Sequence, residues 1–299
     1  MGGGKKKLAQ HNFGGNWTAL KLERVRKYLR AYTTIMSKQP FRFAYIDAFA
    51  GTGYRTLKES GNATELMLPR MYEEDVKKFF DGSARVALEV TPRFSKYIFI
   101  EKNETRFGEL QRLLEEFPDL QTDIKLAQDE ANSYLQELCN HDWLRLRRRA
   151  VLFLDPYGMA VKWNTIEAIA NTQAIDLWIL FPLGMAVNRL LRKDAKINRT
   201  VQNTLNEFFG TEDWFKEFYK NDESPSLFGP LSGQQKVADF DSIEAYFIER
   251  LESVFTKVAK NPLRLYNRRN NPLYLLCFAA GNPKGASTAV KIAQDILKA

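Results

Sequence analysis

An apolar, aromatic run that ends in two glycines constrains the fold of this 299-residue chain more than any other feature. Residues 45–49 have the composition of a buried strand, and Asp47 lies where this strand gives way to a loop. Gly51 and Gly53 follow, and glycine lets the backbone turn tightly and approach a ligand closely. One such turn is a weak indication alone, so its meaning depends on the rest of the chain.

Apolar strand patterns alternate with helical patterns over the first 184 residues. We expect strands at 41–49, 97–100, 124–127, 151–154 and 175–181, and helices at 17–36, 84–90, 105–117, 133–146 and 163–170. This alternation predicts right-handed β-α-β crossovers and a parallel sheet. The predicted fold class is therefore α/β, with a Rossmann-like core that occupies residues 17–184.

Three further parts complete the expected organisation. Residues 1–16, rich in glycine and lysine, are predicted to form a flexible tail. Residues 185–260 show helical patterns and predict a helical insertion packed at the edge of the sheet. Within 261–299, two strand patterns flank a turn and a helical pattern follows, which predicts an antiparallel hairpin and a helix that complete the core. The sheet should then be mostly parallel with a terminal antiparallel hairpin.

Composition limits the class of protein without defining it. The net charge of +8 favours a polyanionic partner such as a nucleic acid, but 44 basic residues face 36 acidic ones, so charge alone leaves this open. No apolar run approaches the roughly 20 residues of a membrane span, so no membrane association is expected. Cys139 and Cys277 make neither a disulfide framework nor a metal cluster. We predict a cytoplasmic protein without a metal site.

Basic residues occur in three places where a phosphate contact can be considered. Those of the first helix, Lys21 and Arg24 among them, are expected to lie mostly on a solvated face. The run at 145–149 precedes a strand and is predicted to be a solvated helix end, opposite the glycine turn. Arg264, Arg268 and Arg269 surround the predicted hairpin and are candidate phosphate contacts.

Carboxylates follow three later strands at the same relative place. Glu101, Asp129 and Asp155 come directly after the second, third and fourth strands. In a parallel sheet these ends lie along one rim beside the glycine turn, where ligands bind. A carboxylate after the second strand can accept both ribose hydroxyls, and a polar group after the third can take an adenine amino proton. Each carboxylate alone is as often a helix cap or surface charge, and it is their repetition that predicts a site.

The glycine turn differs from those of two common nucleotide sites. A dinucleotide fingerprint needs a third glycine where this chain has Thr56, and the phosphate-loop lysine motif is absent. Asp47 precedes Gly51 by four residues, as expected where a carboxylate meets a ligand ammonium group. These features favour a cofactor that carries an amino acid and an adenosine.

These segments resemble the successive motifs of class I S-adenosylmethionine-dependent methyltransferases. They look closest to the bacterial three-Cys-motif partner proteins, through Lys21 on the first helix, residues 45–53, residues 99–102 and the Asp155-Pro156-Tyr157-Gly158 segment. The resemblance covers residues 17–184 and, less closely, the terminal hairpin and helix, whereas 185–260 match nothing. It implies S-adenosylmethionine as the cofactor.

The resemblance also implies roles for individual residues. Asp47, Gly51 and Gly53 would hold the methionine end, with Phe49 in the same motif. Glu101 would hold the ribose, with Lys102 beside it, and Asp129 would hold the adenine. Asp155, Pro156 and Tyr157 would face the transferred methyl group as catalytic residues, and Asp155 would also bind the cofactor. Lys21, from the family motif, and Arg268, from the predicted hairpin, are the candidate substrate contacts.

The acceptor stays open at this point. In amino-methylating relatives a D-P-P-[YF] segment binds the acceptor amino group while its aromatic ring stacks on a flipped base. This chain has one proline, and its aromatic residue, Tyr157, comes one place early. We predict methyl transfer to a nucleic acid or a nucleic-acid-associated acceptor. The alternatives are a methyltransferase of proteins or small molecules, and a non-catalytic cofactor-binding module that docks a partner protein of the three-Cys-motif type.

Overall fold

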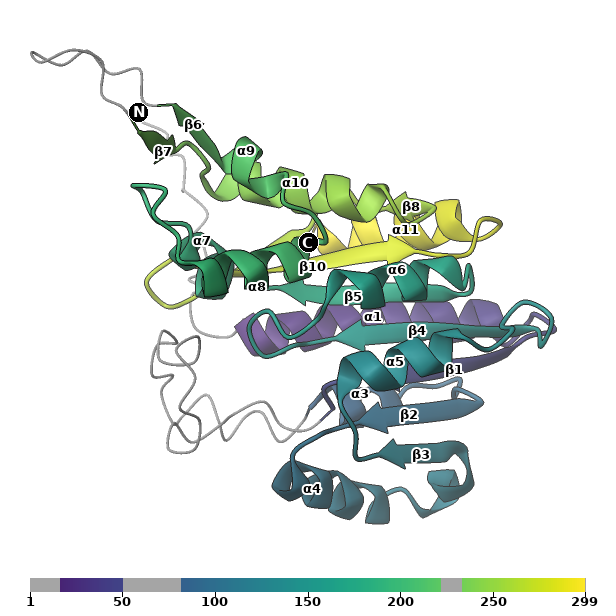
Figure 1. The fold of residues 1–299 in the computed structure, drawn as a ribbon. Helices are drawn as coiled ribbons and strands as arrows, with labels where there is room; N and C mark the ends of the chain where they lie inside the picture. Colours follow the sequence, from purple (N-terminus) through teal and green to yellow (C-terminus); the bar gives the residue numbers. More distant parts are fainter. Residues whose placement is uncertain (1–16, 51–81, 222–232, 299) are drawn as a thin grey trace, which may run out of the picture.

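A computed structural model describes residues 17–50, 82–221 and 233–298 (Figure 1). Its main sheet has the strand order β3-β2-β1-β4-β5-β10-β8, with β9 also paired to β10. The five parallel strands are β1 (Arg42–Asp47), β2 (Lys96–Ile100), β3 (Ile124–Ala127), β4 (Arg148–Leu154) and β5 (Ile175–Phe181). The predicted α/β fold with a mostly parallel sheet is therefore confirmed.

The end of the sheet is antiparallel, as the hairpin pattern predicted. Strand β10 (Pro272–Ala280) runs antiparallel to β5 and to both β8 (Lys257–Val258) and β9 (Leu263–Tyr266). Because β10 begins beside the end of β5, with Leu275 opposite Phe181, the β9–β10 turn lies at the edge where the parallel strands end.

Helices cover both faces of the sheet and bury two apolar clusters. One cluster lies under α1 (Trp17–Met36), α3 (Ser83–Leu88), α4 (Glu104–Glu115) and α11 (Ala286–Leu297). The other lies under α5 (Ala131–Cys139), α6 (Trp163–Asn171), α8 (Arg199–Phe209), α9 (Trp214–Phe218) and α10 (Phe240–Glu252). Strands buried on both sides explain why the sequence shows continuous apolar runs rather than alternation.

Local sequence explains the course of the helices. In α1 the residues Val25, Tyr28, Leu29 and Tyr32 recur at helical spacing, and all are buried. Helix α8 begins where the Asn198 side chain accepts a hydrogen bond from the Val201 backbone N–H. It ends at Gly210, whose left-handed φ of +70° suits glycine.

Helix α5 is shorter than the pattern at 133–146 predicts, because it ends at Cys139. Trp143 is buried beneath the sheet, and its indole N–H donates to the Leu138 carbonyl at 3.1 Å, which pulls the chain out of the helical path. The basic run therefore occupies a turn and the start of β4, with Arg147 at φ 49°, and it is not a helix end. It lies where β4 begins, at the edge of the sheet opposite the ends of the parallel strands, as predicted.

The region 185–260 is not purely helical, in contrast to the prediction. A π-helical turn (Leu183–Val187) leads into the short helix α7 (Asn188–Leu190). Strands β6 (Tyr219–Asn221) and β7 (Gln234–Lys236) form a separate two-stranded sheet, and β8 joins the main sheet. Strands of two or three residues are too short to show a periodic pattern in the sequence. Among the described residues, no helix combines the length and apolarity that crossing a bilayer requires.

Candidate functional site

The strand ends bring four of the predicted carboxylates to one rim. Asp47 is the last residue of β1 and pairs with Phe99 of β2 and Phe153 of β4. Glu101 and Asp155 lie two residues beyond those partners, about 7 Å further along the strand direction. Asp129 follows β3 at the corresponding place. In Figure 1 the arrowheads of β2, β3, β4 and β5 point to this one side.

Asp47 is fully buried beneath the rim. Its Oδ1 accepts the Phe49 backbone N–H at 3.2 Å, and its Oδ2 accepts the Tyr45 hydroxyl at 3.3 Å. Burial raises the pKa of Asp47 to about 7, and nearby Asp155 adds to the rise, while hydrogen bonds from Ser83 and Phe49 oppose it. A neighbouring cation, such as a ligand ammonium group, would stabilise the ionised form of this carboxyl group.

Glu101 is held in a fixed orientation at the end of β2. Only 7% of the residue is exposed, and Oε1 accepts the Asn103 backbone N–H at 2.7 Å, with the Arg106 guanidinium 4.0 Å away. Lys102 and Asp129 are exposed beside it. From β2 to β3 the rim thus offers the nearly buried carboxylate of Glu101 and the exposed carboxylate of Asp129. This is the arrangement expected for binding a ribose and an adenine.

Lys21 of α1 reaches the end of β4 and forms an ion pair with Asp155 Oδ2. The Lys21 side chain is 1% exposed and that of Asp155 is 21% exposed. The rings of Trp17 and Phe153 lie 5.3 and 5.8 Å from the Lys21 ammonium. The predicted solvated face is therefore wrong for Lys21 and for Arg24, which is 6% exposed, because the first turns of α1 lie over the sheet.

The segment after Asp155 presents an aromatic side chain to solvent. Pro156 is buried, whereas Tyr157 is 39% exposed and is one of the few large apolar side chains exposed among the described residues. Gly158 follows with a left-handed φ of +59°, which turns the chain back toward α6.

The other predicted residues are distributed as follows. Phe49 is half-buried against the cluster under α5 and α6. Arg268 is exposed in the β9–β10 turn at the same rim. Arg264 forms ion pairs with Asp241 and Glu244 at 2.5 Å each, so it is not a phosphate contact as considered from the sequence. Gly51 and Gly53 lie outside the described residues.

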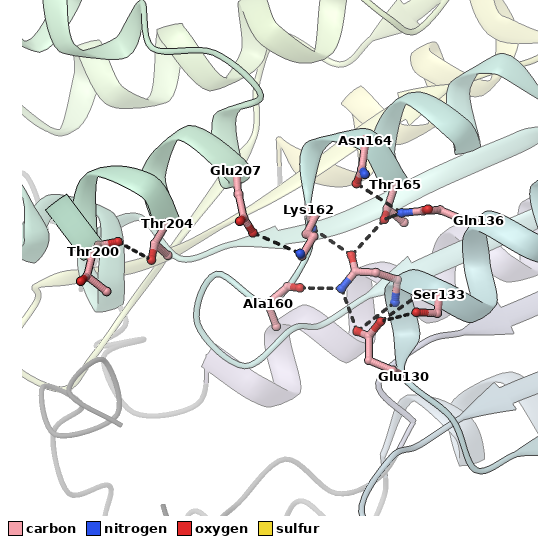
Figure 2. Close-up of polar contacts among 11 residues, drawn as sticks. Glu130, Ser133, Gln136, Ala160, Lys162, Asn164, Thr165, Thr200, Thr204 and Glu207 are labelled. Carbon is pink, nitrogen blue, oxygen red and sulfur yellow. Dashed lines mark hydrogen bonds and ion pairs between the residues drawn. The ribbon is translucent and has the colours of Figure 1, made fainter. Parts of the chain in front are cut away.

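A buried asparagine, Asn132, which the sequence did not single out, joins two rim loops, and Figure 2 labels its partners Glu130, Ala160, Lys162 and Thr165. The amide nitrogen of Asn132 donates to Glu130 Oε1 and to the Ala160 carbonyl, both at 2.8 Å. Its oxygen accepts the Lys162 backbone N–H at 2.9 Å and the Thr165 hydroxyl at 3.0 Å. The loop after β4 is thereby tied to the loop after β3.

One part of this network, the contact of Glu130 with the start of α5, could be inferred from the local sequence. Glu130 begins α5 by accepting the backbone N–H groups of Asn132 and Ser133. Although partial burial raises the pKa of Glu130, these hydrogen bonds lower it overall. A carboxylate just before a helical pattern is a usual capping signal. The contacts of Asn132 span about 30 residues, and no spacing in the sequence indicates them.

The described residues fit a cofactor that combines an amino acid with an adenosine. Asp47 supplies a buried carboxyl group whose ionisation a cation would favour, and Glu101 supplies an oriented acceptor one strand away. No group of three or more metal-ligating side chains occurs within the described ranges.

Comparisons with known proteins give resemblance in fold at low identity. No protein-family model and no curated protein sequence matches the chain. Among solved structures, protein LPL1258 from Legionella pneumophila aligns over 95% of this chain and 92% of its own, with 13% identity and a TM-score of 0.47. Magnesium protoporphyrin IX methyltransferase from Synechocystis, solved with bound SAH, aligns over 93% and 90%, with 12% identity and a TM-score of 0.37. Similarity of this extent assigns no activity, so the proposals below rest on the chain's own residues.

Proposed function

We propose that this protein is an S-adenosylmethionine-dependent methyltransferase that acts on a nucleic acid or a nucleic-acid-associated acceptor. The observation that carries the proposal is the buried Lys21–Asp155 ion pair at the end of β4, next to the buried carboxyl groups of Asp47 and Glu101. Asp47 would stand beneath the methionine end of the cofactor, Glu101 would accept the ribose hydroxyls, and Asp129 would face the adenine.

Asp155 is suited to hold an acceptor amino group. Among the described residues its hydrogen-bond partner is Lys21, which donates to Oδ2, and 21% of the Asp155 side chain stays exposed. The ion pair with the buried Lys21 ammonium fixes the orientation of the Asp155 carboxylate. Tyr157, exposed two residues later, offers a ring on which a flat acceptor such as a nucleobase can stack.

Methyl transfer depends more on the alignment of the acceptor with the methyl group than on proton transfer. The cofactor supplies a methyl group on a sulfonium centre. In the proposed transfer, the acceptor nitrogen would bond to the methyl carbon while the carbon–sulfur bond breaks and its electron pair stays on the sulfur. Asp155 would accept a hydrogen bond from the acceptor N–H and direct the nitrogen lone pair, and the proton then passes to solvent. The role of the protein is to align the two groups and exclude water.

Calorimetric titration with S-adenosylmethionine and S-adenosylhomocysteine tests the cofactor site. Glu101→Ala should weaken binding by two or more powers of ten, because two charge-assisted hydrogen bonds of roughly 1.5–3 kcal/mol each are lost. Glu104→Ala, which removes an exposed carboxylate three residues on, should bind as the wild type does. Folded wild-type protein that binds neither compound would overturn the proposal.

Transfer of a radiolabelled methyl group to RNA, DNA and protein fractions tests the reaction. Asp155→Asn and Tyr157→Ala should abolish or strongly reduce labelling while calorimetry still shows cofactor binding. Tyr157→Ala changes an exposed side chain, so its folding should be unaffected. Labelling of protein alone would favour the alternative acceptor class. Cofactor binding without transfer to any fraction would favour a non-catalytic module.

A further inference from the structure

Charge is divided along the rim. On the half formed by β1, β2 and β3, the residues at the strand ends are mostly acidic: Asp47, Glu101, Lys102, Glu104, Asp129 and Glu130. On the half formed by β5 and β10, the chain that follows β5 and the turn that precedes β10 are basic. The neutral Lys21–Asp155 pair at the end of β4 lies between the two halves.

The basic half contains a compact run of exposed cations after β5. Residues 189–199 hold five bases and one acid, and the bases are all exposed: Arg189, Arg192, Lys193, Lys196 and Arg199. Asp194 is bound by Arg192 through two hydrogen bonds of 3.0 Å. Among the described residues no carboxylate pairs with the other four, so a net positive charge remains on this segment.

Two further observations show that this charge is unfavourable within the folded chain. Lys236 donates to Asn188 Oδ1 at 2.6 Å and to the Asn188 carbonyl, both neutral acceptors. Partial burial lowers the pKa of Lys236 and the charge of Lys193 adds to the fall, whereas Asp239 opposes it. Arg199 is the first residue of α8, where the helix dipole disfavours a cation, and no acidic residue stands in that turn. A bound polyanion would relieve both costs.

The β9–β10 turn lies next to this segment and adds two bases. A side chain on Gly184, in the turn after β5, would meet the Pro272 carbonyl oxygen at 2.0 Å, so the two chain segments are in direct backbone contact. Arg268 and Arg269 are exposed in the turn that precedes Pro272. We define the basic rim as residues 189–199 together with Lys236, Arg268 and Arg269.

We infer that the basic rim binds the phosphate backbone of a single-stranded nucleic acid and leads it toward Asp155 and Tyr157. This inference rests on the proposed function for its biological role. Phosphate contacts need only exposed cations, and these dominate affinity for nucleic acids. Protein partners usually need apolar or aromatic anchors, and residues 188–199 contribute no exposed large apolar side chain. An exposed aromatic residue at the neighbouring strand end suits an unpaired base.

Binding of a fluorescein-labelled single-stranded RNA of about 20 nucleotides, followed by anisotropy between 50 and 200 mM salt, tests this inference. The variant Arg189→Ala/Lys193→Ala/Lys196→Ala removes three charges from the basic rim. The matched control Arg42→Ala/Arg93→Ala/Arg148→Ala removes three exposed charges from the opposite edge of the sheet.

The rim variant should bind at least tenfold more weakly at the lower salt, and the slope of log K against log salt should fall by about 2, since each phosphate contact on a single strand contributes about 0.7. The control should keep the wild-type slope. Equal losses in both variants, or none in the rim variant, would overturn the inference.

Cofactor calorimetry on the same proteins separates the two proposals. The rim variant should bind S-adenosylmethionine as the wild type does, which also shows that it is folded. If wild-type protein binds the cofactor but no RNA, the docking inference fails and the methyltransferase proposal stands with another acceptor. If the rim variant alone loses RNA while no protein binds cofactor, the docking inference holds and the methyltransferase proposal fails.

Discussion

Replacing the two members of the Lys21–Asp155 pair separately should have unequal effects on stability. In Asp155→Asn the ammonium keeps its position, 1% exposed, without a charged partner, and breaking a buried pair in this way costs about 3–5 kcal/mol. In Lys21→Met the aliphatic stem still packs between Trp17 and Phe153, and the remaining carboxylate, 21% exposed, keeps part of its hydration. We expect Lys21→Met to lower the free energy of unfolding by about 1–2 kcal/mol.

The double variant Lys21→Met/Asp155→Asn leaves no uncompensated charge, so its free energy of unfolding should lie close to that of Lys21→Met alone. Urea unfolding followed by circular dichroism measures all four proteins. The coupling energy between the two sites should then equal the cost of Asp155→Asn, about 3–5 kcal/mol, which is at or above the upper end of the range seen for residues in direct contact. Effects that add to within about 0.5 kcal/mol would refute the conclusion that the two charges stabilise each other.

Three other variants probe the surroundings of the site. Because burial raises the folded-state pKa of Asp47 to about 7, the stability contributed by its protonated form is fully present below about pH 4 and is lost as the pH rises from about 4 to 7. Asp47→Asn should therefore match the wild type in urea unfolding at about pH 4 and exceed it at about pH 8, with a difference that grows by up to about 1.4 kcal/mol per pH unit between about pH 4 and 7, and a constant difference would contradict the assigned pKa. Asn132→Ala should lower the free energy of unfolding by about 2–3 kcal/mol, since it leaves buried polar groups without partners, whereas Gln136→Ala, beside it, should cost less than about 1 kcal/mol. Gly210→Ala should lower the melting temperature by several degrees, because φ is +70° and the new Cβ would lie 2.1 Å from the Trp163 ring, and an unchanged melting temperature would show that the ring can move.

The sequence predicted the elements whose signals are local. Helix α1 has the bounds that its periodicity predicts, and β3 and β5 begin and end where their apolar runs do. The carboxylates lie along one rim because parallel strands all end on the same side, which is a consequence of topology rather than of any long-range contact.

What could not be predicted depends on contacts between distant segments. A lysine on an amphipathic helix normally indicates a solvated face, and the partner that buries Lys21 lies 134 residues away. The early end of α5 follows from the burial of Trp143, which only the packed sheet reveals. Asn132 likewise belongs to no recognisable sequence pattern, because it bonds to Ala160 and Lys162 in the segment that follows β4.

The contacts of α1 have a consequence for synthesis on the ribosome. This helix is made before any strand, yet its rings pack on the last strand of the sheet: the ring centroids of Trp17 and Tyr274 lie 5.0 Å apart, and those of Tyr28 and Phe278 lie 4.8 Å apart. Lys21 must also wait for Asp155. The part of α1 that packs on β10 therefore stays uncovered until the final strand has left the exit tunnel, although Tyr32 can already meet Phe43 of β1. A truncated product would expose the aromatic face of α1, which is the kind of surface that chaperones retain.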